Sequence, residues 1–410
     1  MNRRSFLRSA AGVSVVTAAG CLSALDPSSS SPSAIDDRDA TAYDDGTEAW
    51  PGYGFDPQNT WHNPDVSLFS DPPSARRITR SGPEIETTPD SAVAVAGNRL
   101  YFGTADGLVV SYATTGEQLW EYTANRRTGV TTTPLLAREL TFVTTGNGTA
   151  ALTADSGGRL WGSDAFVRSG SSVLADGRLY ATTEGTLVVA LEVETGDTAW
   201  TLTEDDLAAE DGDFGDTRPT VDALGVADDV VYATGSWKGE GTILAVEDGE
   251  TLWWRDDFDA IRRPPAVGED LVVITTRTGV FALDRTNGHT EWEFPFPSGW
   301  SVAQGLTPAI AHGHVYVNGG GETTCLDLET GEKLWAHETG GRRKPPVAVA
   351  DGLYVGTLEG LYALEPDGTL AWHDEGIRTE RPVTAVGNRL YAVVSAGELG
   401  SDDVYELTDW

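Results

Sequence analysis

The 410-residue sequence contains only two cysteines, Cys21 and Cys325. Two isolated cysteines exclude a disulfide framework, a CxxC metal site and a CxxCH haem attachment. Cys325 stands in the apolar run TTCLDL, which is typical of a small core residue. No run after residue 21 approaches the length of a transmembrane helix. The sequence also has no GxSxG elbow and no phosphate-cradling loop.

Lysine is nearly absent, since Lys238, Lys333 and Lys344 are the only three among 28 basic residues. The 63 acidic residues give a formal net charge of −35. Such a surface repels nucleic acid, which we therefore exclude as a partner. We interpret the composition as adaptation to molar salt, of the haloarchaeal type. At about 1 M salt the Debye length is only about 3 Å, so the repulsion between carboxylates is screened and a carboxylate-rich surface stays soluble.

The first 49 residues are predicted to be a targeting signal followed by a tether. Arg3 and Arg4, followed by Phe6 and Leu7, resemble the twin-arginine export signal. Residues 18–21 (AAGC) resemble a lipobox, so we expect residues 1–21 to be a signal peptide. Lipidated Cys21 would then anchor the protein at the extracytoplasmic face of the cell membrane; plain cleavage near Gly20 is the alternative. Residues 22–49, rich in Ser, Pro and Asp, predict a disordered tether.

One repeat dominates residues 50–410. Each unit begins with Pro or Ser, continues through short alternating strands and a TG turn, and ends on a strand with a tryptophan about 42 residues from the next. The tryptophans are Trp120, Trp161, Trp200, Trp253, Trp292, Trp335 and Trp372. The eight starts are Pro89, Pro134, Ser172, Pro219, Pro265, Pro308, Pro346 and Pro382. Four strands per unit at this period predict an all-β, eight-bladed propeller with four-stranded antiparallel blades.

The two ends of the repeat region complement each other. The last repeat, residues 382–408, has three strands and no fourth. Residues 75–81 (ARRITRS) precede the first repeat as a fourth strand would. We therefore expect the N-terminal strand to close the last blade and remove its open edge.

These units resemble the PQQ-like β-propeller repeat family over nearly all of residues 50–410. The segment WPGYGFDPQNTWHNP (residues 50–64) is similar to the opener of exported, non-enzymatic members. The resemblance implies that the seven blade tryptophans are structural, packing between neighbouring blades with each N–H on a backbone acceptor. It extends to the propeller lipoprotein of the outer-membrane assembly machine. A halophile with a single membrane has no such machine, so that role is not carried over.

The same resemblance raises quinoprotein chemistry as an alternative. It implies PQQ above a Ca²⁺ held by Glu, Asn and Asp, with an Asp base and often a disulfide between adjacent cysteines. The chain has no adjacent cysteines, and most units are near minimal blade length, so we expect no catalytic residue and no cofactor, PQQ included. His312 and His314 flank a turn glycine without a third ligand, and residues 210–216 lack EF-hand spacing, so we expect no metal. Asn147 is either a glycosylation site or an unmodified turn.

Basic residues gather at one repeat position, the connection from one blade to the next. Eleven of the 28 lie there: Arg126, Arg127, Arg168, Arg218, Arg262, Arg263, Arg342, Arg343, Lys344, Arg378 and Arg381. These connections should surround one mouth of the channel. Arginine beside exposed tryptophan is typical of an interaction hot spot. The predicted binding face therefore comprises Arg218, Arg263, Arg343, Arg381, Trp237 and Trp300; local pairing of these arginines with carboxylates is the alternative.

Three functions remain open from the sequence. The first is a monomeric envelope scaffold that binds a protein or peptide partner through this face. The second is a PQQ- or metal-dependent oxidoreductase. The third is a propeller that binds a small anion or a sugar at the channel mouth, where arginine holds carboxylate or phosphate.

Overall fold

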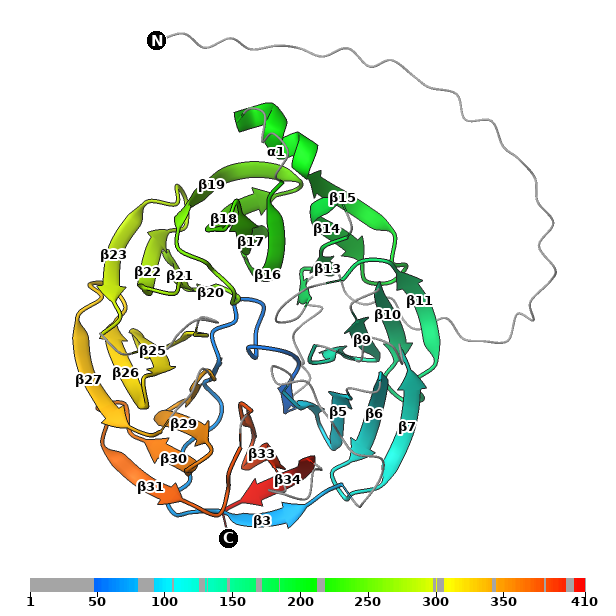
Figure 1. Cartoon of the computed structure of the whole chain (residues 1–410). Coiled ribbons are helices and arrows are strands. Elements are labelled where there is room, and N and C mark those ends of the chain that lie inside the picture. Colours follow the sequence, from blue (N-terminus) through cyan, green and yellow to red (C-terminus); the bar gives the residue numbers. More distant parts are fainter. Residues whose placement is uncertain are drawn as a thin grey trace, which may run out of the picture. The chain divides into compact units, whose positions relative to one another are not determined.

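A computed structural model describes residues 48–79, 92–104, 107–124, 130, 132–145, 148–166, 172–183, 185–211, 218–297, 300, 306–340, 344–379, 381–395 and 402–409. Within these ranges the strands form eight sheets around a central axis (Figure 1). The predicted eight-bladed propeller is thus confirmed. No helix among the described residues is long and apolar enough to cross a membrane.

Several predicted features lie outside the described residues. They are the export signal with Arg3 and Arg4, the lipidation site Cys21, the tether as far as residue 47, the loop 212–216, the sequon Asn147, and the basic residues Arg126, Arg127, Arg168, Arg342 and Arg343. The tether was predicted to end at residue 49, whereas Ala49 already lies in a strand.

The strands of each blade are given from the innermost to the outermost. Blade 1 has β4 (Ala94–Ala96), β5 (Arg99–Gly103), β6 (Leu108–Ala113) and β7 (Gln118–Thr123). Blade 2 has β8 (Leu135–Ala137), β9 (Leu140–Thr145), β10 (Gly148–Thr153) and β11 (Arg159–Ser163). Blade 3 has β12 (Val173–Ala175), β13 (Arg178–Ala181), β14 (Thr186–Glu192) and β15 (Thr198–Thr203). Helix α1 (Glu204–Asp211) leads to blade 4, with β16 (Thr220–Ala227), β17 (Val230–Trp237), β18 (Glu240–Glu247) and β19 (Glu250–Phe258).

The second half of the ring repeats the pattern. Blade 5 has β20 (Ala266–Val267), β21 (Leu271–Thr275), β22 (Gly279–Asp284) and β23 (Thr290–Pro295). Blade 6 has β24 (Ala309–Ala311), β25 (His314–Gly319), β26 (Glu322–Asp327) and β27 (Lys333–Glu338). Blade 7 has β28 (Val347–Val349), β29 (Gly352–Thr357), β30 (Gly360–Leu364) and β31 (Leu370–Asp374). Blade 8 has β32 (Thr384–Val386), β33 (Arg389–Ser395) and β34 (Asp402–Thr408), completed by β3 (Ser74–Arg77).

The N-terminal strand closes the ring as predicted. β3 pairs antiparallel with β34, from Ser74 opposite Thr408 to Arg77 opposite Tyr405. In Figure 1, β3 in blue lies outside β34 in red, beyond the end of the last blade. The strand is shorter than the predicted 75–81, because it ends at Arg77. Joining the two chain ends in one sheet removes the edge that β34 would otherwise expose.

The strands alternate in direction, which gives the propeller two faces. The turn face carries the turns between first and second strands and between third and fourth strands. The connection face carries the turns between second and third strands and the blade-to-blade connections, including residues 204–211, 218–219, 259–265, 375–379 and 381–383. Inner strands such as β24 are fully buried, whereas outer strands such as β27 alternate between exposed and partly buried residues.

The blade tryptophans join each blade to the next. Six indole N–H groups donate to backbone carbonyls of the following segment at 2.7–2.9 Å: Trp120 to Ala154, Trp161 to Val193, Trp253 to Arg285, Trp292 to Leu328, Trp335 to Pro366 and Trp372 to Phe69. A turn glycine of the following blade lies beneath five of these six rings, the exception being Trp372. A Cβ at Gly157, for example, would stand 2.6 Å from Trp120. The TG turn of the repeat is therefore required by the tryptophan of the preceding blade.

Trp200 departs from this pattern. Its Nε1 is buried and has no hydrogen-bond partner. The facing turn in blade 4 contains only Asp248 and Gly249 between β18 and β19, so the usual acceptor position is missing. Gly249 is also farther from the indole, 3.5 Å from its Cβ position.

This difference gives a matched pair of substitutions. Trp253→Phe removes the 2.8 Å hydrogen bond to Arg285 O, which keeps only Tyr232 Oη at 3.5 Å, whereas Trp200→Phe removes an N–H that has no partner. We expect Trp253→Phe to lower the free energy of unfolding by about 1 kcal/mol more than Trp200→Phe. Denaturant unfolding of the two full-length variants measures this difference. Equal losses would show that the hydrogen bond adds nothing to the joint.

Candidate functional site

The central channel contains the chain's own N-terminal segment. Residues 48–66, here called the entry segment, run through the middle of the ring in blue before the chain reaches β3 (Figure 1). Two short strands form within it. β1 (Ala49–Trp50) pairs antiparallel with β4 of blade 1, and β2 (His62–Asn63) pairs parallel with β28 of blade 7. The sequence indicated a family opener here but not this path.

Backbone carbonyls of the entry segment point outward to the inner strands. They accept from the N–H groups of Gly97, Leu136, Val226, Val267, Ile310, Ala348 and Ala350 at 2.7–2.9 Å. The donors belong to blades 1, 2, 4, 5, 6 and 7. Glu48 and Val66, at the two ends of the segment, bond residues in first-to-second strand turns, so both ends lie toward the turn face.

Two asparagine side chains extend these contacts. Asn59 Nδ2 donates to Leu224 O at 2.8 Å and to Pro265 O at 3.2 Å, and so links blades 4 and 5. Asn63 Nδ2 donates to Ala385 O at 2.8 Å in blade 8. With these bonds the entry segment contacts seven of the eight blades through hydrogen bonds in the described residues.

The interior of the channel is aromatic. Trp50 and Trp61 are fully buried, with ring centroids 6.0 Å apart. Tyr53 meets Trp61 edge-on at 4.9 Å, and Phe55 lies 5.1 Å from Trp50. Phe55, Asn59 and Trp61 all have positive φ angles, so the segment holds a strained backbone that its contacts stabilise. The channel is therefore a packed core and not a water-filled chamber.

Asp56 fixes the sharp turn of this segment. Its carboxylate accepts hydrogen bonds from Thr60 N at 2.9 Å and from Thr60 Oγ1. Burial raises the pKa of the Asp56 carboxyl to about 6, although the bonds from Thr60 act in the opposite direction. Burial thus disfavours the charged form of the Asp56 carboxyl, which would be better solvated in water.

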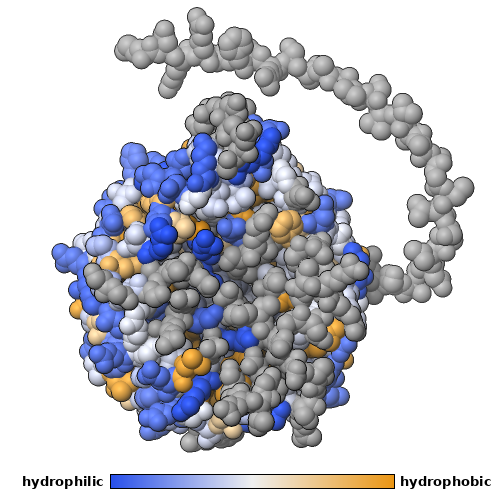
Figure 2. All heavy atoms as spheres, viewed as in Figure 1, coloured by the Kyte–Doolittle hydropathy of each residue, from blue (hydrophilic) through white to orange (hydrophobic). Residues whose placement is uncertain are grey.

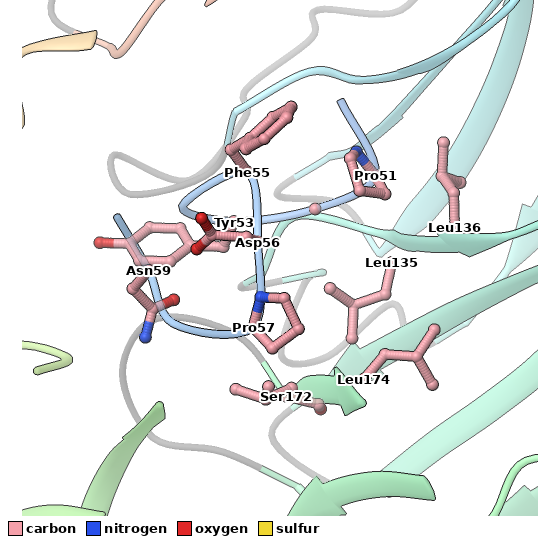
Figure 3. A pocket seen from close by; sticks show the side chains of 12 residues that line it. Pro51, Tyr53, Phe55, Asp56, Pro57, Asn59, Leu135, Leu136, Ser172 and Leu174 are labelled. Atoms are coloured by element: carbon pink, nitrogen blue, oxygen red, sulfur yellow. The ribbon is translucent and has the colours of Figure 1, made fainter. Parts of the chain in front are cut away.

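A narrow pocket lies beside this turn. Figure 3 shows Asp56, Tyr53 and Pro57 on one side and Leu135 and Leu174 of blades 2 and 3 on the other. This is where the entry segment passes blade 3 without a backbone hydrogen bond to it. The space inside is little wider than a water molecule, too small for a cofactor or sugar.

The two histidines weighed as metal ligands belong to a different arrangement. His312 Nδ1 and His314 Nδ1 both lie near Tyr316 Oη, at 3.2 and 3.1 Å, and His312 Nε2 bonds Val349 O at 2.7 Å. His62 of the entry segment lies 5.2 Å from His312 between ring centroids. Burial, followed by the nearby His312, lowers the pKa of both His62 and His314. No group of three His, Cys, Asp or Glu side chains within the described ranges is arranged to hold a metal ion.

The arginines of the predicted binding face differ in exposure. Arg218 is exposed, and its guanidinium bonds Glu204 and Asp205 of α1 at 2.9 Å each. Arg263 and Arg381 are both only 8% exposed. Arg262 and Arg378, in the same connections, are exposed. The accessible basic residues are thus partly different from those the sequence singled out.

The two tryptophans of that face are partly buried. Lys238 Nζ lies 3.8 Å from the ring centroid of Trp237, which meets Trp254 edge-on at 5.9 Å. Trp300 stacks on Phe296 at 5.1 Å and covers Gly319 and Gly320 in a turn of blade 6. Trp254 extends the predicted set, and the sequence signal for it was the doubled WW of β19.

The rim of the propeller is mainly hydrophilic. In the view of Figure 1, hydrophobic residues show as separate small areas (Figure 2). Five of the exposed leucines lie on outer strands of five different blades: Leu119, Leu160, Leu252, Leu334 and Leu370. Scattered apolar residues of this kind are normal on a protein surface.

Fold and site together define a PQQ-type β-propeller whose channel is filled by its own N-terminal segment. A family model described as outer membrane protein assembly factor BamB matches residues 36–294 and 293–404. The chain belongs to this family.

The match to a curated relative covers a smaller part. The outer membrane protein assembly factor BamB of Burkholderia pseudomallei (strain K96243) is 29% identical over 153 residues. The match spans 36% of this chain and 36% of that protein.

Solved structures share the fold at low sequence identity. Quinohemoprotein alcohol dehydrogenase from Comamonas testosteroni gives a TM-score of 0.64 at 14% identity, covering 88% of this chain and 80% of that one. BamB from Moraxella catarrhalis gives 0.58 at 16% identity, covering 83% and 98%. A europium-containing methanol dehydrogenase gives 0.64 at 14% identity, covering 87% and 90%. These similarities show the fold alone.

The raised pKa of Asp56 makes one stability prediction. The folded state holds this proton more tightly than the unfolded chain, so the carboxyl makes the free energy of unfolding fall as pH rises from about 4 to about 6. Asp56→Asn removes the titrating group. We expect the variant to gain about 2 kcal/mol relative to the wild type between pH 4 and pH 7.

Unfolding curves across this pH range test the prediction. Asp65→Asn, an exposed substitution in the same segment, serves as the control and should follow the wild type. If Asp56→Asn kept the pH dependence of the wild type, the buried carboxyl would not be its source.

Proposed function

We propose that the protein is an exported, membrane-anchored scaffold that binds a protein or peptide partner through its connection face, without catalysis. The observation that carries the proposal is the entry segment, which fills the channel with Trp50, Tyr53, Phe55 and Trp61. A propeller with a packed axis offers its faces and rim for binding. Membership of a family described by an assembly factor supports a role in contacting other proteins.

The residues present do not fit PQQ and its metal. The aromatic cluster and the hydrogen bonds to seven blades occupy the axis. The pocket beside Asp56 has apolar lining residues together with Asn59 and Ser172, and it is too narrow for a cofactor. The described residues hold no group of three metal-ligating side chains. The dehydrogenase neighbours share only the fold, which hosts unrelated activities.

The connection face offers a definite partner surface. Arg262 and Arg378 are exposed there, and Trp237, Lys238 and Trp254 form an aromatic and cationic group. Both tryptophans pack against the core cluster that contains Leu207 of α1. Partly buried tryptophan with a neighbouring cation is the composition that contributes most binding energy at interfaces. We expect the partner to present carboxylates and an aromatic or aliphatic side chain to this group.

The location follows from the N-terminal sequence. Arg3 and Arg4 would direct export, and lipidated Cys21 would hold the protein at the outer side of the membrane. Residues 22–47 leave a chain long enough to keep the propeller clear of the lipid surface. Release of a Cys21→Ser protein into the medium tests the anchor; retention in the membrane fraction would contradict it.

Cross-linking in intact cells, followed by identification of the captured protein, tests the binding face. The variant is Arg262→Glu, Arg378→Glu and Trp237→Ala combined in the full-length chain. Reversal of two exposed charges and loss of the aromatic group should lower capture of the wild-type partner at least tenfold. Buried Arg263 and Arg381 are left unchanged, so that the fold is preserved.

The control places the same charge change on the turn face. Arg138→Glu and Lys333→Glu lie at the first-to-second and third-to-fourth strand turns of blades 2 and 6, and both are exposed. This variant should capture the partner as the wild type does. Equal capture by both variants would rule out the connection face.

A further inference from the structure

The eighth blade lacks the tryptophan of the other seven. In those blades the tryptophan stands opposite a small residue of the third strand, in the pairs Trp120–Ser111, Trp161–Ala151, Trp200–Ala190, Trp253–Ala245, Trp292–Ala282, Trp335–Cys325 and Trp372–Ala363. In blade 8, Arg76 of β3 stands opposite Glu406 of β34. The second strand supports this equivalence, since Tyr391 pairs with Glu406 as Tyr101 pairs with Ser111.

Arg76 makes the hydrogen bond that a blade tryptophan would make. Its Nη2 donates to Thr114 O of blade 1 at 2.7 Å. Thr114 directly follows the third strand of its blade, as Ala154, the acceptor for Trp120, does. The guanidinium does not reproduce the packing of an indole. A hollow lined by Arg76, Thr114, Arg389, Glu406 and Thr408 lies at this seam.

In blade 8, ion pairs take the place of the missing tryptophan. Glu406 is 6% exposed, and its carboxylate accepts hydrogen bonds from Arg76, including one from Nε at 3.0 Å. Arg389 Nε lies 3.7 Å from the same carboxylate. The next ion pair joins Arg77 Nη2 to Asp403 Oδ1 at 2.6 Å, with Asp403 8% exposed.

The outer strand itself contributes little apolar burial. All four residues of β3 are exposed, and Ile78 is the first buried side chain after it. The hold of β3 on β34 therefore depends on the backbone ladder and on the two ion pairs. If β3 detached, Glu406 would lose Arg76 and keep only Arg389, and Asp403 would lose Arg77.

We propose that Arg76–Glu406 and Arg77–Asp403 form an ionic latch that closes the ring, and that the ring opens first at this seam by release of β3. The Arg76 and Arg77 side chains are 52% and 42% exposed, so salt reaches them. The tryptophan joints are held by uncharged indole rings, and the ion pairs beside three of them, Arg99–Asp155, Arg178–Asp248 and Arg285–Asp228, use aspartates that are at least 73% exposed. Among the joints that the structure describes, the seam is thus the one that depends most on charge and that rising ionic strength should weaken most.

Hydrogen–deuterium exchange of the full-length protein tests the latch. The measured quantity is the exchange rate of β3 divided by that of β7, an outer strand held by Trp120. This ratio should rise severalfold from about 0.1 M to about 1 M KCl, where the Debye length falls from about 10 Å to about 3 Å. Taking the ratio removes any effect of salt on the whole propeller. A ratio independent of salt would overturn the proposal.

Two single substitutions test whether the change in exchange arises from the Arg76–Glu406 pair. Glu406→Gln should raise the ratio at least tenfold. Asp228→Asn removes the Arg285–Asp228 ion pair between blades 4 and 5, where Trp253 remains, and should leave the exchange of β19 unchanged. An equal rise in all outer strands on Glu406→Gln would contradict the latch.

A second variant introduces into blade 8 the tryptophan that the other seven blades have. Arg76→Trp combined with Glu406→Ala restores the pairing found in the other blades. Exchange of β3 should then slow toward that of β7 and depend less on salt than in the wild type, because only the Arg77–Asp403 pair remains. Undiminished salt dependence in a folded double variant would overturn the proposal; if the variant does not fold, the wild-type salt series decides.

Discussion

The structure depends on a set of radial hydrogen bonds between the entry segment and the inner strands. Each inner strand is only two or three residues long in most blades and presents an unpaired edge to the axis. Buried backbone groups of this kind need partners. The entry segment supplies them by turning carbonyls outward to six blades and the Asn63 amide to a seventh. The residues that fill the channel are therefore the same ones that cover the axis-facing edges of the inner strands.

The N-terminal part of the propeller, from residue 48 to β3, holds the ring together at two places. Residues 48–66 fill the axis, and a few residues later β3 forms the outer strand of blade 8. Tryptophan joints hold neighbouring blades along the circumference, while the entry segment holds them from within. A body constrained in both directions provides rigid faces. Binding by residues on those faces, rather than chemistry along the axis, agrees with this construction.

Much of the fold could be predicted from the sequence, because its signals are local and repeated. Strand alternation, the tryptophan period and the incomplete last repeat gave eight blades and their closure. The path of the entry segment could not be predicted, since its contacts join residues hundreds of positions apart, such as Asn63 and Ala385. Its turns also use positive φ at Phe55, Asn59 and Trp61, where no glycine marks them. The aromatic density of residues 50–61 was the available signal of a buried segment.

The candidate face was predicted only in part. Repeat position correctly identifies which end of the blades carries the connections. It does not distinguish exposed Arg262 from its buried neighbour Arg263, because that depends on how each connection crosses the blade. The pairing of Arg218 with α1 likewise required the helix, which is an insertion outside the repeat. The seam was visible in the sequence as ARRITRS, a fourth strand with arginine in place of tryptophan.

Hydrogen exchange of the inner-strand amides tests most directly whether the entry segment closes the channel. The amide N–H groups of Leu136, Val226, Val267, Ile310 and Ala348 donate to it, whereas that of Leu174, the corresponding residue of blade 3, does not. Measured by NMR on the full chain, the five amides should exchange only with global unfolding, and Leu174 should exchange faster. Fast exchange of all six would contradict a closed channel.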